Sequence, residues 1–338
     1  MKKQRVLVLM HRDLVPPAEA GKIEDYTREP WKTEYDVTVT IEDLGHDVKP
    51  LGVYGDLGVL HKAIQEWEPT IVFNLLEEFG GEAMLDQNVV SYLEMLNVRH
   101  TGCNPLGMML ARDKALSKKL LTYHKIRVPR FQVFPRDRTI RRVRALPFPI
   151  FLKSLVEDAS LGISRQSIVE DDKSLVERVG FIHEKIRTDA IGEQYIPGRD
   201  LYVAVMGNRR LTVFPPMELD IKKQGDDLPV IATRKVKFDR KYQKEMGVQT
   251  TAAKLSPELL AHVQRISRRI FKILNLNGYA RMDFRLTEDG QLFFLEANPN
   301  PELAYGEDFA ESAEKAGVGY EDLVLRILHL GLTWKREL

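Results

Sequence analysis

The stretch 278–302, GYARMDFRLTEDGQLFFLEANPNPE, restricts the fold more than any other part of the chain. Two runs of alternating residues flank Asp289-Gly290, and an Asp-Gly pair between such runs is the strongest short-range signal for a β-hairpin. A two-residue loop at this point pairs Glu288 with Gln291 and sets the register of both strands. The sequence therefore predicts a hairpin whose facing residues can be counted outwards from the turn.

Counting outwards brings four polar side chains together. The register places Asp283 opposite Glu296 and Arg281 opposite Asn298, on one face of the hairpin. The other face is apolar and predicted to be core: Met282, Phe284, Leu286, Phe293, Leu295 and Ala297. Opposed carboxylates repel each other, and a magnesium ion held by their oxygens would offset that repulsion. A solvated face in which Arg281 neutralises a carboxylate explains the same pattern, so the hairpin alone leaves both interpretations open.

Length and composition limit the class of protein. The 338 residues are too many for one ordinary core and predict two or three lobes. With 43% hydrophobic and 29% charged residues the composition is that of a soluble globular protein. A net charge of +1 gives no overall field to favour nucleic acid or a membrane, and we expect neither as a partner. No apolar run approaches the roughly 18 residues of a membrane span, and the N-terminus is typical of a strand, not a signal peptide.

The single cysteine, Cys103, bears on compartment and on chemistry. One cysteine cannot form an internal disulfide, which fits a reducing compartment, and we expect a cytoplasmic protein. Only His100 lies near it in the sequence. A small buried side chain is therefore the favoured interpretation, and a nucleophile the less favoured one.

The first hundred residues show buried strands that alternate with helices. Arg5–His11 is continuously apolar, as in a strand buried on both faces of a parallel sheet. Strict alternation of apolar residues predicts a strand within 31–44. Further strands are expected at Asp47–Val53 and 70–75, and helices at Leu57–Trp67 and 86–96. This order predicts a doubly wound, mostly parallel sheet.

The remaining chain has a different pattern of secondary structure, with a boundary near 125–145. A helix over 106–124 precedes several short strands, beginning with PIFLKSL and ISRQSIV, which predict an antiparallel α+β arrangement. Helices are expected at 174–187, 257–274 and 320–332. The polar segment 224–249 has little periodicity and is long enough to be a working loop.

Several charged residues lie in or beside apolar strands. Lys153 ends PIFLK, and a buried lysine is costly unless it reaches solvent or meets an anion. The loop after it, SLVEDASLG, ends in small residues whose backbone N–H groups could cradle phosphate oxygens. Glu193 and Asp200 flank a turn and could bind an adenine amino group and a ribose, or could be turn residues. Neither a GxxxxGK[ST] nor a GxGxxG motif is present, which argues against a Walker A loop and a nicotinamide dinucleotide.

The order of these motifs resembles that of the ATP-grasp superfamily, in its D-alanine–D-alanine ligase-like branch. The series is Asp113-Lys114, Lys153 with its loop, EQYIPGRD, and RMDF…LEANPNP, and the resemblance extends from FNLLEEFGGEAML to the final helix. It implies an α/β ATP-grasp fold: an N-terminal doubly wound parallel-sheet domain followed by two α+β lobes that clamp ATP. The expected boundaries are 1–110, 111–198 for the small lobe and 199–338 for the large lobe with the metal site.

The resemblance also implies roles for individual residues. The nucleotide would be bound by Lys114 and Lys153 at the phosphates, Ser160, Leu161 and Gly162 in the loop over them, Glu193, Tyr195 and Ile196 at the adenine, Asp200 at the ribose, and Lys241 on a mobile loop. Asp283, Glu296 and Asn298 would hold magnesium, two ions in such ligases, with manganese as a substitute. Arg281 and Lys241 would be catalytic, with Arg281 steadying the reacting acyl group. The hairpin counted from geometry and the metal site of the family are thus the same residues.

The implied reaction is ATP-dependent amide formation through an acyl phosphate, with release of ADP and phosphate. The segments that would bind the two substrates differ from those of true D-alanine–D-alanine ligases. HRDLVPPAEAGKIED replaces a serine- and glutamate-containing segment, Ala159 stands where a serine is typical, and Glu302 stands where those ligases have a glycine. Glu302 and Glu307 are suited to a cationic or amine-bearing acceptor. We expect that the protein does not make D-alanyl-D-alanine at a useful rate.

Three functional classes fit the sequence. The favoured one is a ligase that joins a small-molecule carboxylate to a small-molecule amine. The second is a ligase that modifies a peptide or protein, which would want a strongly charged groove. The third is a non-catalytic ATP-binding protein, and Arg281 counts against it because a mere binder needs no acyl-stabilising arginine. The resemblance leaves a homodimer open.

Overall fold

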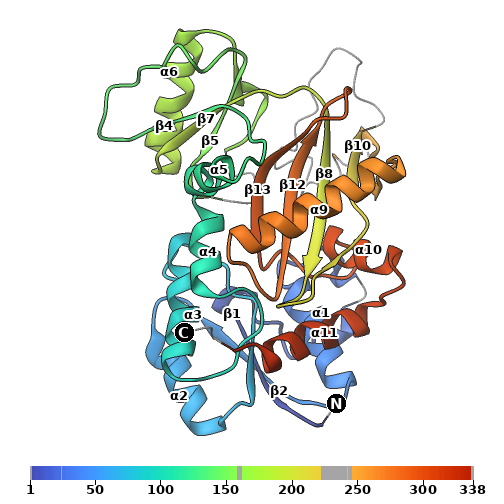
Figure 1. Ribbon diagram of the computed structural model, residues 1–338. Helices are drawn as coiled ribbons and strands as arrows, with labels where there is room; N and C mark the ends of the chain where they lie inside the picture. The colour runs from blue at the N-terminus through green and yellow to red at the C-terminus, as the bar shows by residue number, and fades with distance from the viewer. Residues whose placement is uncertain (1, 24, 158–161, 222–241, 243–245, 336–338) are drawn as a thin grey trace.

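Three β-sheets organise the structure (Figure 1). The computed structural model describes residues 2–23, 25–157, 162–221, 242 and 246–335. A parallel sheet lies at the bottom, a large antiparallel sheet at the upper right, and a small antiparallel sheet at the upper left of Figure 1. This is the mixed α/β architecture that the sequence predicts.

The N-terminal sheet has the order β2-β1-β3, with all strands parallel. Its elements are β1 (Arg5–His11), β2 (Asp47–Val53), β3 (Ile71–Asn74), α1 (Lys32–Asp43), α2 (Leu57–Trp67) and α3 (Asp86–Met95), with 3-10 turns at Arg12–Leu14, Ala20–Lys22, Tyr26–Arg28 and Ala83–Leu85. Alternate β1 residues pack against α1 on one face and against α2 and α3 on the other. Helices on both faces confirm the doubly wound prediction.

Helix α1 overturns the strand that we predicted within 31–44. Tyr35, Val37, Val39 and Ile41 alternate in sequence, but only Val37 and Ile41 are buried hydrophobics, and they are four residues apart. That spacing is one face of a helix. The prediction was wrong because residues at every second position lie on different faces of a helix, and β-branched residues occur on more than one face of α1.

The chain leaves this sheet through α4 (Pro105–Arg112) and α5 (Lys114–Tyr123). The single helix expected over 106–124 is broken at Asp113, whose extended backbone and side chain cap the N-terminus of α5. The small sheet follows, with the order β4-β7-β5-β6. Its elements are β4 (Phe131–Phe134), β5 (Ile150–Ser154), β6 (Ile168–Val169), β7 (Ala190–Gln194), α6 (Asp172–Phe181) and a π-helical turn (Ile182–Ile186). ISRQSIV is mostly not a strand, since a 3-10 turn (Arg165–Ser167) precedes the short β6.

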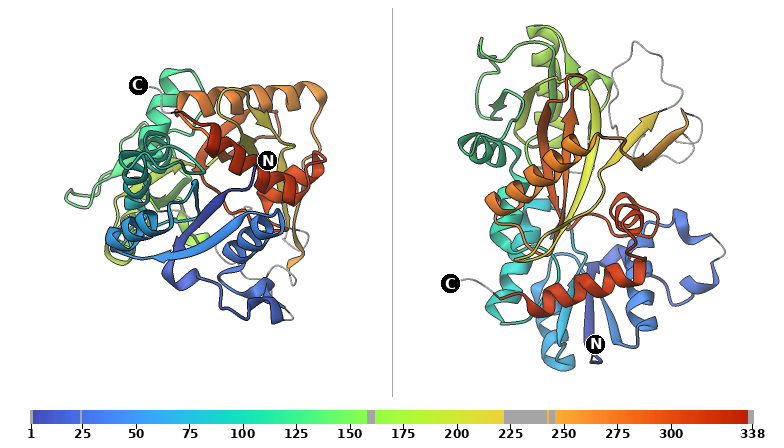
Figure 2. Two further views of the ribbon diagram at one scale, coloured as in Figure 1. Left: turned by 90° about the horizontal axis from the view of Figure 1, so that it is seen from below. Right: turned by 45° about the vertical axis from the view of Figure 1, so that its right-hand side comes forward.

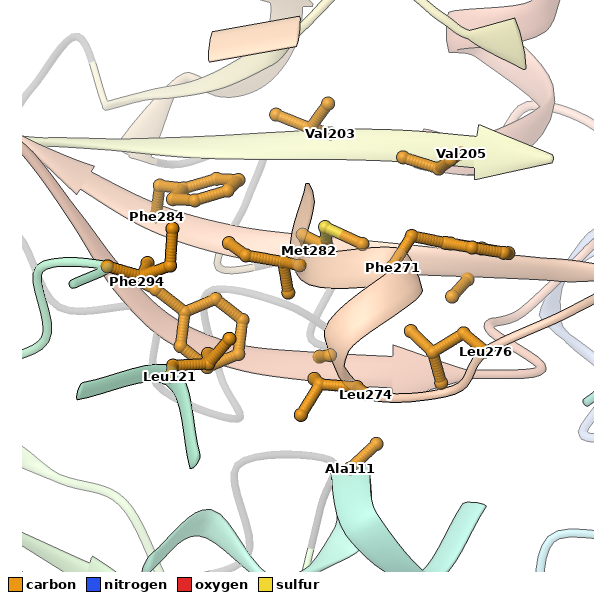
Figure 3. Close-up of a cluster of buried hydrophobic side chains, with 14 of the residues drawn as sticks. Ala111, Leu121, Val203, Val205, Phe271, Leu274, Leu276, Met282, Phe284 and Phe294 are labelled. Carbon is orange, nitrogen blue, oxygen red and sulfur yellow. The ribbon is translucent and has the colours of Figure 1, made fainter. Parts of the chain in front are cut away.

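The large sheet has the order β11-β10-β8-β12-β13, with β9 also paired to β8. Its elements are β8 (Arg199–Met206), β9 (Thr212–Val213), β10 (Met217–Ile221), β11 (Val248–Ala252), β12 (Tyr279–Leu286), β13 (Leu292–Pro299), α9 (Pro257–Ile273) and α10 (Asp308–Lys315). Figure 3 shows one face of this sheet packed against α9 through Val203, Met282, Phe284 and Phe271. Most of 224–249, the expected working loop, lies outside the described residues.

The opposite face of β8 and β12 continues into the N-terminal core. Ala204, Met206 and Tyr279 belong to the same buried cluster as Val6 and Val37. The final helix, α11 (Tyr320–Thr333), packs against α1 and lies beside the N-terminal sheet in both views of Figure 2. The parallel sheet therefore covers one end of the polar face of β12 and leaves the rest to face the small sheet.

Candidate active site

A cleft lies between the small sheet and the polar face of the large sheet. Its lining includes seven of the residues expected at the nucleotide and metal: Lys153, Glu193, Tyr195, Ile196, Asp200, Asp283 and Glu296. These residues come from β5, β7, β8, β12 and β13 and from the turn between β7 and β8. Segments that are far apart in the sequence thus meet at one cavity.

The hairpin register at the site is confirmed. Arg281 pairs with Asn298 and Asp283 pairs with Glu296, as counted from the sequence. The turn itself is different: the pairing of Thr287 with Gln291 leaves a three-residue loop in place of the predicted two-residue loop. An irregularity between Asp283 and Phe284 compensates for that extra residue.

The same irregularity corrects part of the predicted core. Beyond it, Leu292 and Phe294 are buried, whereas Phe293 and Leu295 are only partly buried. A bulge adds one residue to a strand and so exchanges its two faces. As a result, Leu295 lines the cleft beside Glu296.

Arg281 holds the metal-site carboxylate that lies two residues along the same strand. Its Nε and Nη2 donate to Asp283 Oδ1 and Oδ2 at 2.8 and 3.1 Å. Asn298 Nδ2 donates to Asp283 Oδ2 at 3.4 Å, and the Arg281 guanidinium lies 5.1 Å from the ring centroid of Tyr202. Burial favours the neutral guanidinium, but the Asp283 carboxylate outweighs it and raises the pKa of Arg281. The arginine is therefore a fixed positive charge.

A buried lysine that the sequence analysis missed completes a network of charges under the cleft. Lys118 Nζ lies 2.8 Å from Glu193 Oε1 and also donates to the carbonyl of Leu295. Lys153 Nζ lies 3.5 Å from Glu193 Oε1 and 3.0 Å from Glu296 Oε2. Lys153 thus joins the nucleotide side of the cleft to the metal-site hairpin.

The two lysines differ in the direction of their pKa shift because they have different partners. Burial lowers the pKa of Lys118 to about 8, which the single carboxylate of Glu193 does not fully reverse. Lys153 is also buried, but the carboxylates of Glu193 and Glu296 together raise its pKa. Burial would raise the pKa of Glu193, and the two lysines lower it instead. Lys153 and Glu193 therefore stay charged in the cleft.

The turn between β7 and β8 supplies the predicted adenine and ribose residues. The Tyr195 N–H donates to the carbonyl of Pro149 at 2.9 Å, which fixes the turn against β5. Asp200 Oδ1 lies 3.2 Å from Arg285 Nη1, and that nitrogen also donates to the Gly198 carbonyl at 3.1 Å. Arg285 is a cleft residue that sequence reasoning missed, although it lies on the same strand face as Asp283.

The predicted phosphate loop is described only in part. Ser160 and Leu161, and Lys241 on the second loop, lie outside the described residues. Gly162 has φ +72°, and a Cβ there would meet Ile186 Cδ1 at 2.4 Å, so the position requires glycine. Lys114 is buried and does not line the cleft; its Nζ donates to the carbonyl of Glu157 at 2.8 Å. It thereby anchors the start of this loop.

The donors at the hairpin fit magnesium. Asp283 and Glu296 face each other and Asn298 adds an amide oxygen, which is an all-oxygen set for a hard cation. Among the residues that the structure describes, no group of three or more His, Cys, Asp or Glu side chains could hold a metal. Two carboxylates suit an ion that takes its other ligands from phosphate and water. Arg281 neutralises the carboxylate of Asp283, and Lys153 neutralises that of Glu296.

Cys103 is not placed for nucleophilic chemistry. It is fully buried, and burial raises the pKa of its thiol to about 12. A thiol with that pKa is almost entirely protonated at neutral pH. The favoured prediction, a small buried side chain, is therefore confirmed.

Glu34, in the first turn of α1, is a buried carboxyl whose pKa is raised to about 8 by burial, with further contributions from Glu77 and Glu302. The folded protein then holds a proton that the unfolded chain releases above about pH 4.5. Glu34→Gln should therefore stabilise the protein by an amount that is near zero at pH 4 and grows to at most about 5 kcal/mol at pH 8.

Urea denaturation of both proteins at pH 4 to 8 measures this difference. Glu42→Gln, an exposed change on the same helix, is the control and should show no such trend. A stabilisation by Glu34→Gln that is independent of pH, or that falls as the pH rises, contradicts a neutral buried carboxyl.

Comparison with known proteins identifies the family. Residues 119–329 match the family model described as D-ala D-ala ligase C-terminus. The chain belongs to this family, within the ATP-grasp superfamily. It is by that membership an ATP-dependent, ADP-forming ligase.

Individual relatives agree with this assignment. The chain is 31% identical over 299 residues to the uncharacterized protein y4sG of Sinorhizobium fredii, covering 86% of this chain and 85% of that one. It is 28% identical over 273 residues to D-alanine–D-alanine ligase B of Chromobacterium violaceum, covering 80% and 84% of the two chains.

Solved structures confirm the fold. The D-alanine–D-alanine ligase of Bacillus anthracis, complexed with ATP, superposes with a TM-score of 0.76 at 19% identity and 98% coverage of both chains. The VanG D-Ala:D-Ser ligase of Enterococcus faecalis has a TM-score of 0.67 at 17% identity, covering 98% of this chain and 100% of that one. Among the helices that the structure describes, none is both long and apolar enough to cross a bilayer.

Proposed function

We propose that the protein joins a small-molecule carboxylate to a small-molecule amine at the expense of ATP, through an acyl phosphate. The observation that carries the proposal is the pairing of Asp283 with Glu296 beside Arg281, in a cleft that also holds Lys153. A binding protein needs no such opposed carboxylates with a fixed guanidinium next to them. Family membership supports the same reaction class.

ATP would lie along the cleft, from the turn between β7 and β8 to the hairpin. Tyr195 and Ile196 would contact the adenine, Asp200 the ribose, and Lys153 the phosphates. Lys114 acts through the phosphate loop, which it anchors at Glu157. Gly162, with Ser160 and Leu161, would close the loop over the phosphates, and Lys241 would bind them from a second loop.

The substrate carboxylate attacks the γ-phosphate to give an acyl phosphate and ADP. The amine then attacks the acyl carbon, and phosphate leaves from the tetrahedral intermediate. Magnesium on Asp283, Glu296 and Asn298 would neutralise charge on the transferred phosphoryl group. Arg281 offers its guanidinium to the oxyanion, and Asp283 keeps it in place. No protein nucleophile is needed, so the protein contributes positioning and charge.

The acyl phosphate can be trapped without knowing the amine. We expect hydroxylamine to form a hydroxamate from the correct carboxylate, with ATP and magnesium, and to form none without ATP. A panel of carboxylates therefore reports the acid half of the substrate pair. A wild-type protein that binds ATP and gives no hydroxamate with any carboxylate speaks against the acyl-phosphate route.

The segments that would bind the two substrates argue against D-alanyl-D-alanine as the product. Glu302 stands where D-alanine–D-alanine ligases have a glycine, whose backbone N–H can approach the oxyanion closely. The glutamate puts a carboxylate at that position. We expect phosphate release with D-alanine as sole substrate to be roughly 100-fold or more below that of a dedicated D-alanine–D-alanine ligase measured beside it. Comparable turnover of the two enzymes overturns this part of the proposal.

Three further points are proposed with the function. The segments 1–110, 111–198 and 199–338 serve as the N-terminal domain, small lobe and large lobe. Manganese replaces magnesium, since both accept the same oxygen donors. The enzyme works in the cytoplasm on free small molecules.

A further inference from the structure

A second cavity, of about 550 Å³, lies where α5 ends and the chain enters the small sheet (Figure 1). Its walls are the segment that joins α5 to β4 and the turn 143–146 that precedes β5. The described residues that line it are all different from those that line the nucleotide cleft. Sites for small molecules have volumes of roughly 300–1,000 Å³. The cavity is therefore large enough for a small-molecule ligand of its own.

The charged groups that line this cavity all have the same sign. Among the residues that the structure describes, Lys125, Arg127 and Arg130 line it, and no acidic residue does. Within that part of the chain, no carboxylate lies at ion-pair distance from any of the three. Arg130 uses one N–H donor on the carbonyl of Ala145, at 3.5 Å. The cavity thus offers three cations without anionic partners in the described structure.

The surrounding chain adds further positive charge. Residues 122–146 hold eight lysines and arginines and one acidic residue, whereas the whole chain has a net charge of +1. Arg269, on α9, donates from Nη2 to the carbonyl of His124 at 3.1 Å, and so places another cation at the end of α5. One sign of charge around a concave site raises the local concentration of ions of the opposite sign. The small net charge of the chain conceals this local field.

The rest of the lining is mostly apolar. Ile126, Pro129 and Leu146 are buried, whereas Val143 is 50% exposed. An exposed valine in an otherwise basic segment would be removed from water by an apolar group that entered the cavity. The lining therefore fits a ligand that has an apolar body as well as a negative charge.

Hydrogen bonds within the protein hold the turn 143–146 in place. Gln132, on β4, donates from Nε2 to the carbonyl of Arg141 at 2.9 Å, and its Oε1 accepts from the Val143 N–H at 2.8 Å. Arg142 Nη1 donates to the carbonyl of Leu146 at 2.7 Å. A ligand would meet a wall that is already ordered, which lowers the entropic cost of binding.

The opposite wall is fixed by the strands of the nucleotide cleft. The carbonyl of Arg130 accepts from the Gln194 N–H at 2.7 Å, and the carbonyl of Arg127 accepts from the Phe294 N–H at 2.9 Å. Gln194 itself lines the nucleotide cleft. The backbone of this wall is thus held by β7 and β13, and the side chains of its cations carry none of these bonds.

We propose that this second cavity binds a small organic anion, a carboxylate or phosphate on an apolar body. Three cations without anionic partners repel one another, and an anion would offset that repulsion. Guanidinium groups bind carboxylate and phosphate oxygens through paired N–H donors. A nucleic acid is less suited, because Phe131 is the one aromatic side chain among the described lining residues and base stacking uses several. The inference does not depend on the proposed ligase function.

Two fluorescent probes that share one skeleton test the proposal. They are 8-anilinonaphthalene-1-sulfonate, which is an anion, and N-phenyl-1-naphthylamine, which lacks the sulfonate. Titration of the intact protein would give a dissociation constant for each. Arg127→Gln, and separately Lys125→Gln, should weaken binding of the anion by at least about 5-fold and change that of the neutral probe by less than about 2-fold.

Two further variants separate the cavity from the charge of the segment. Arg138→Gln is the matched control, because Arg138 is exposed in the same basic segment and does not line the cavity, so it should keep full binding of the anion. Ala145→Phe keeps the charge but narrows the cavity, and it should weaken both probes. Thermal unfolding of each variant should stay close to that of the wild type.

Displacement of the bound anion by hexanoate or by hexyl phosphate then identifies the head group that the cavity prefers. Absence of anion binding, or equal losses in Arg127→Gln and Arg138→Gln, overturns the proposal. Displacement by a single-stranded oligonucleotide, but by neither small anion, assigns the surface to a polyanion and also overturns it.

Discussion

Glu296→Gln is expected to lower hydroxamate formation at least about 100-fold, more than any other single isosteric change in the cleft. The substitution removes one of the two opposed carboxylates and takes from Lys153 Nζ its partner at 3.0 Å. Magnesium would lose a charged ligand, and the phosphoryl group would lose the charge neutralisation that depends on it. The size of the side chain is unchanged, so packing is kept.

Three measurements separate the loss of a metal ligand from a general loss of folded structure. Thermal unfolding should stay close to that of the wild type, and raising the magnesium concentration should recover part of the activity. Glu288→Gln, exposed at the turn of the same hairpin, should leave the rate unchanged. Full activity of Glu296→Gln at low magnesium contradicts its role as a metal ligand.

Lys118→Met is expected to destabilise the protein by about 3–5 kcal/mol. Lys118 is fully buried, and its ammonium lies 2.8 Å from a Glu193 carboxylate that is itself 2% exposed. Removing the lysine leaves a buried negative charge with Lys153 as its remaining described partner, at 3.5 Å. The methionine fills a similar volume, so the loss reports charge and not a cavity.

Denaturant unfolding at pH 7 measures the change, and the adjacent lysine provides the control. Lys119 is exposed, and Lys119→Met should alter stability by no more than about 0.5 kcal/mol. The double variant Lys118→Met, Glu193→Gln should recover part of the loss because no unpaired charge remains. A Lys118→Met protein as stable as Lys119→Met contradicts the buried ion pair.

The hairpin shows how far the sequence could carry the site. The facing pairs at Arg281 and Asp283 were predictable because side-chain alternation and the Asp-Gly turn determine them. The three-residue loop and the bulge were not, because each shifts the register by one residue and the two shifts cancel at Asp283. The predicted register was therefore right at the site, whereas the prediction that Phe293 and Leu295 face the core was wrong.

Other parts depended on tertiary packing. Helix α1 could not be separated from a strand by periodicity in a segment rich in β-branched residues. Lys118 carries no local signal that it is buried, because its partner Glu193 is 75 residues away in the sequence. The nearest hint was a lysine in DKALSKKLL at the interval of one helical turn from Lys114.

The central claim is tested most directly by the release of ADP and phosphate from ATP with magnesium. A panel of carboxylates, each with and without amines, would be compared for the wild type and the double variant Asp283→Ala, Glu296→Ala. The ligase account predicts release that requires both an acid and an amine and that disappears in the double variant. Release that needs neither partner, or that survives loss of both carboxylates, contradicts it.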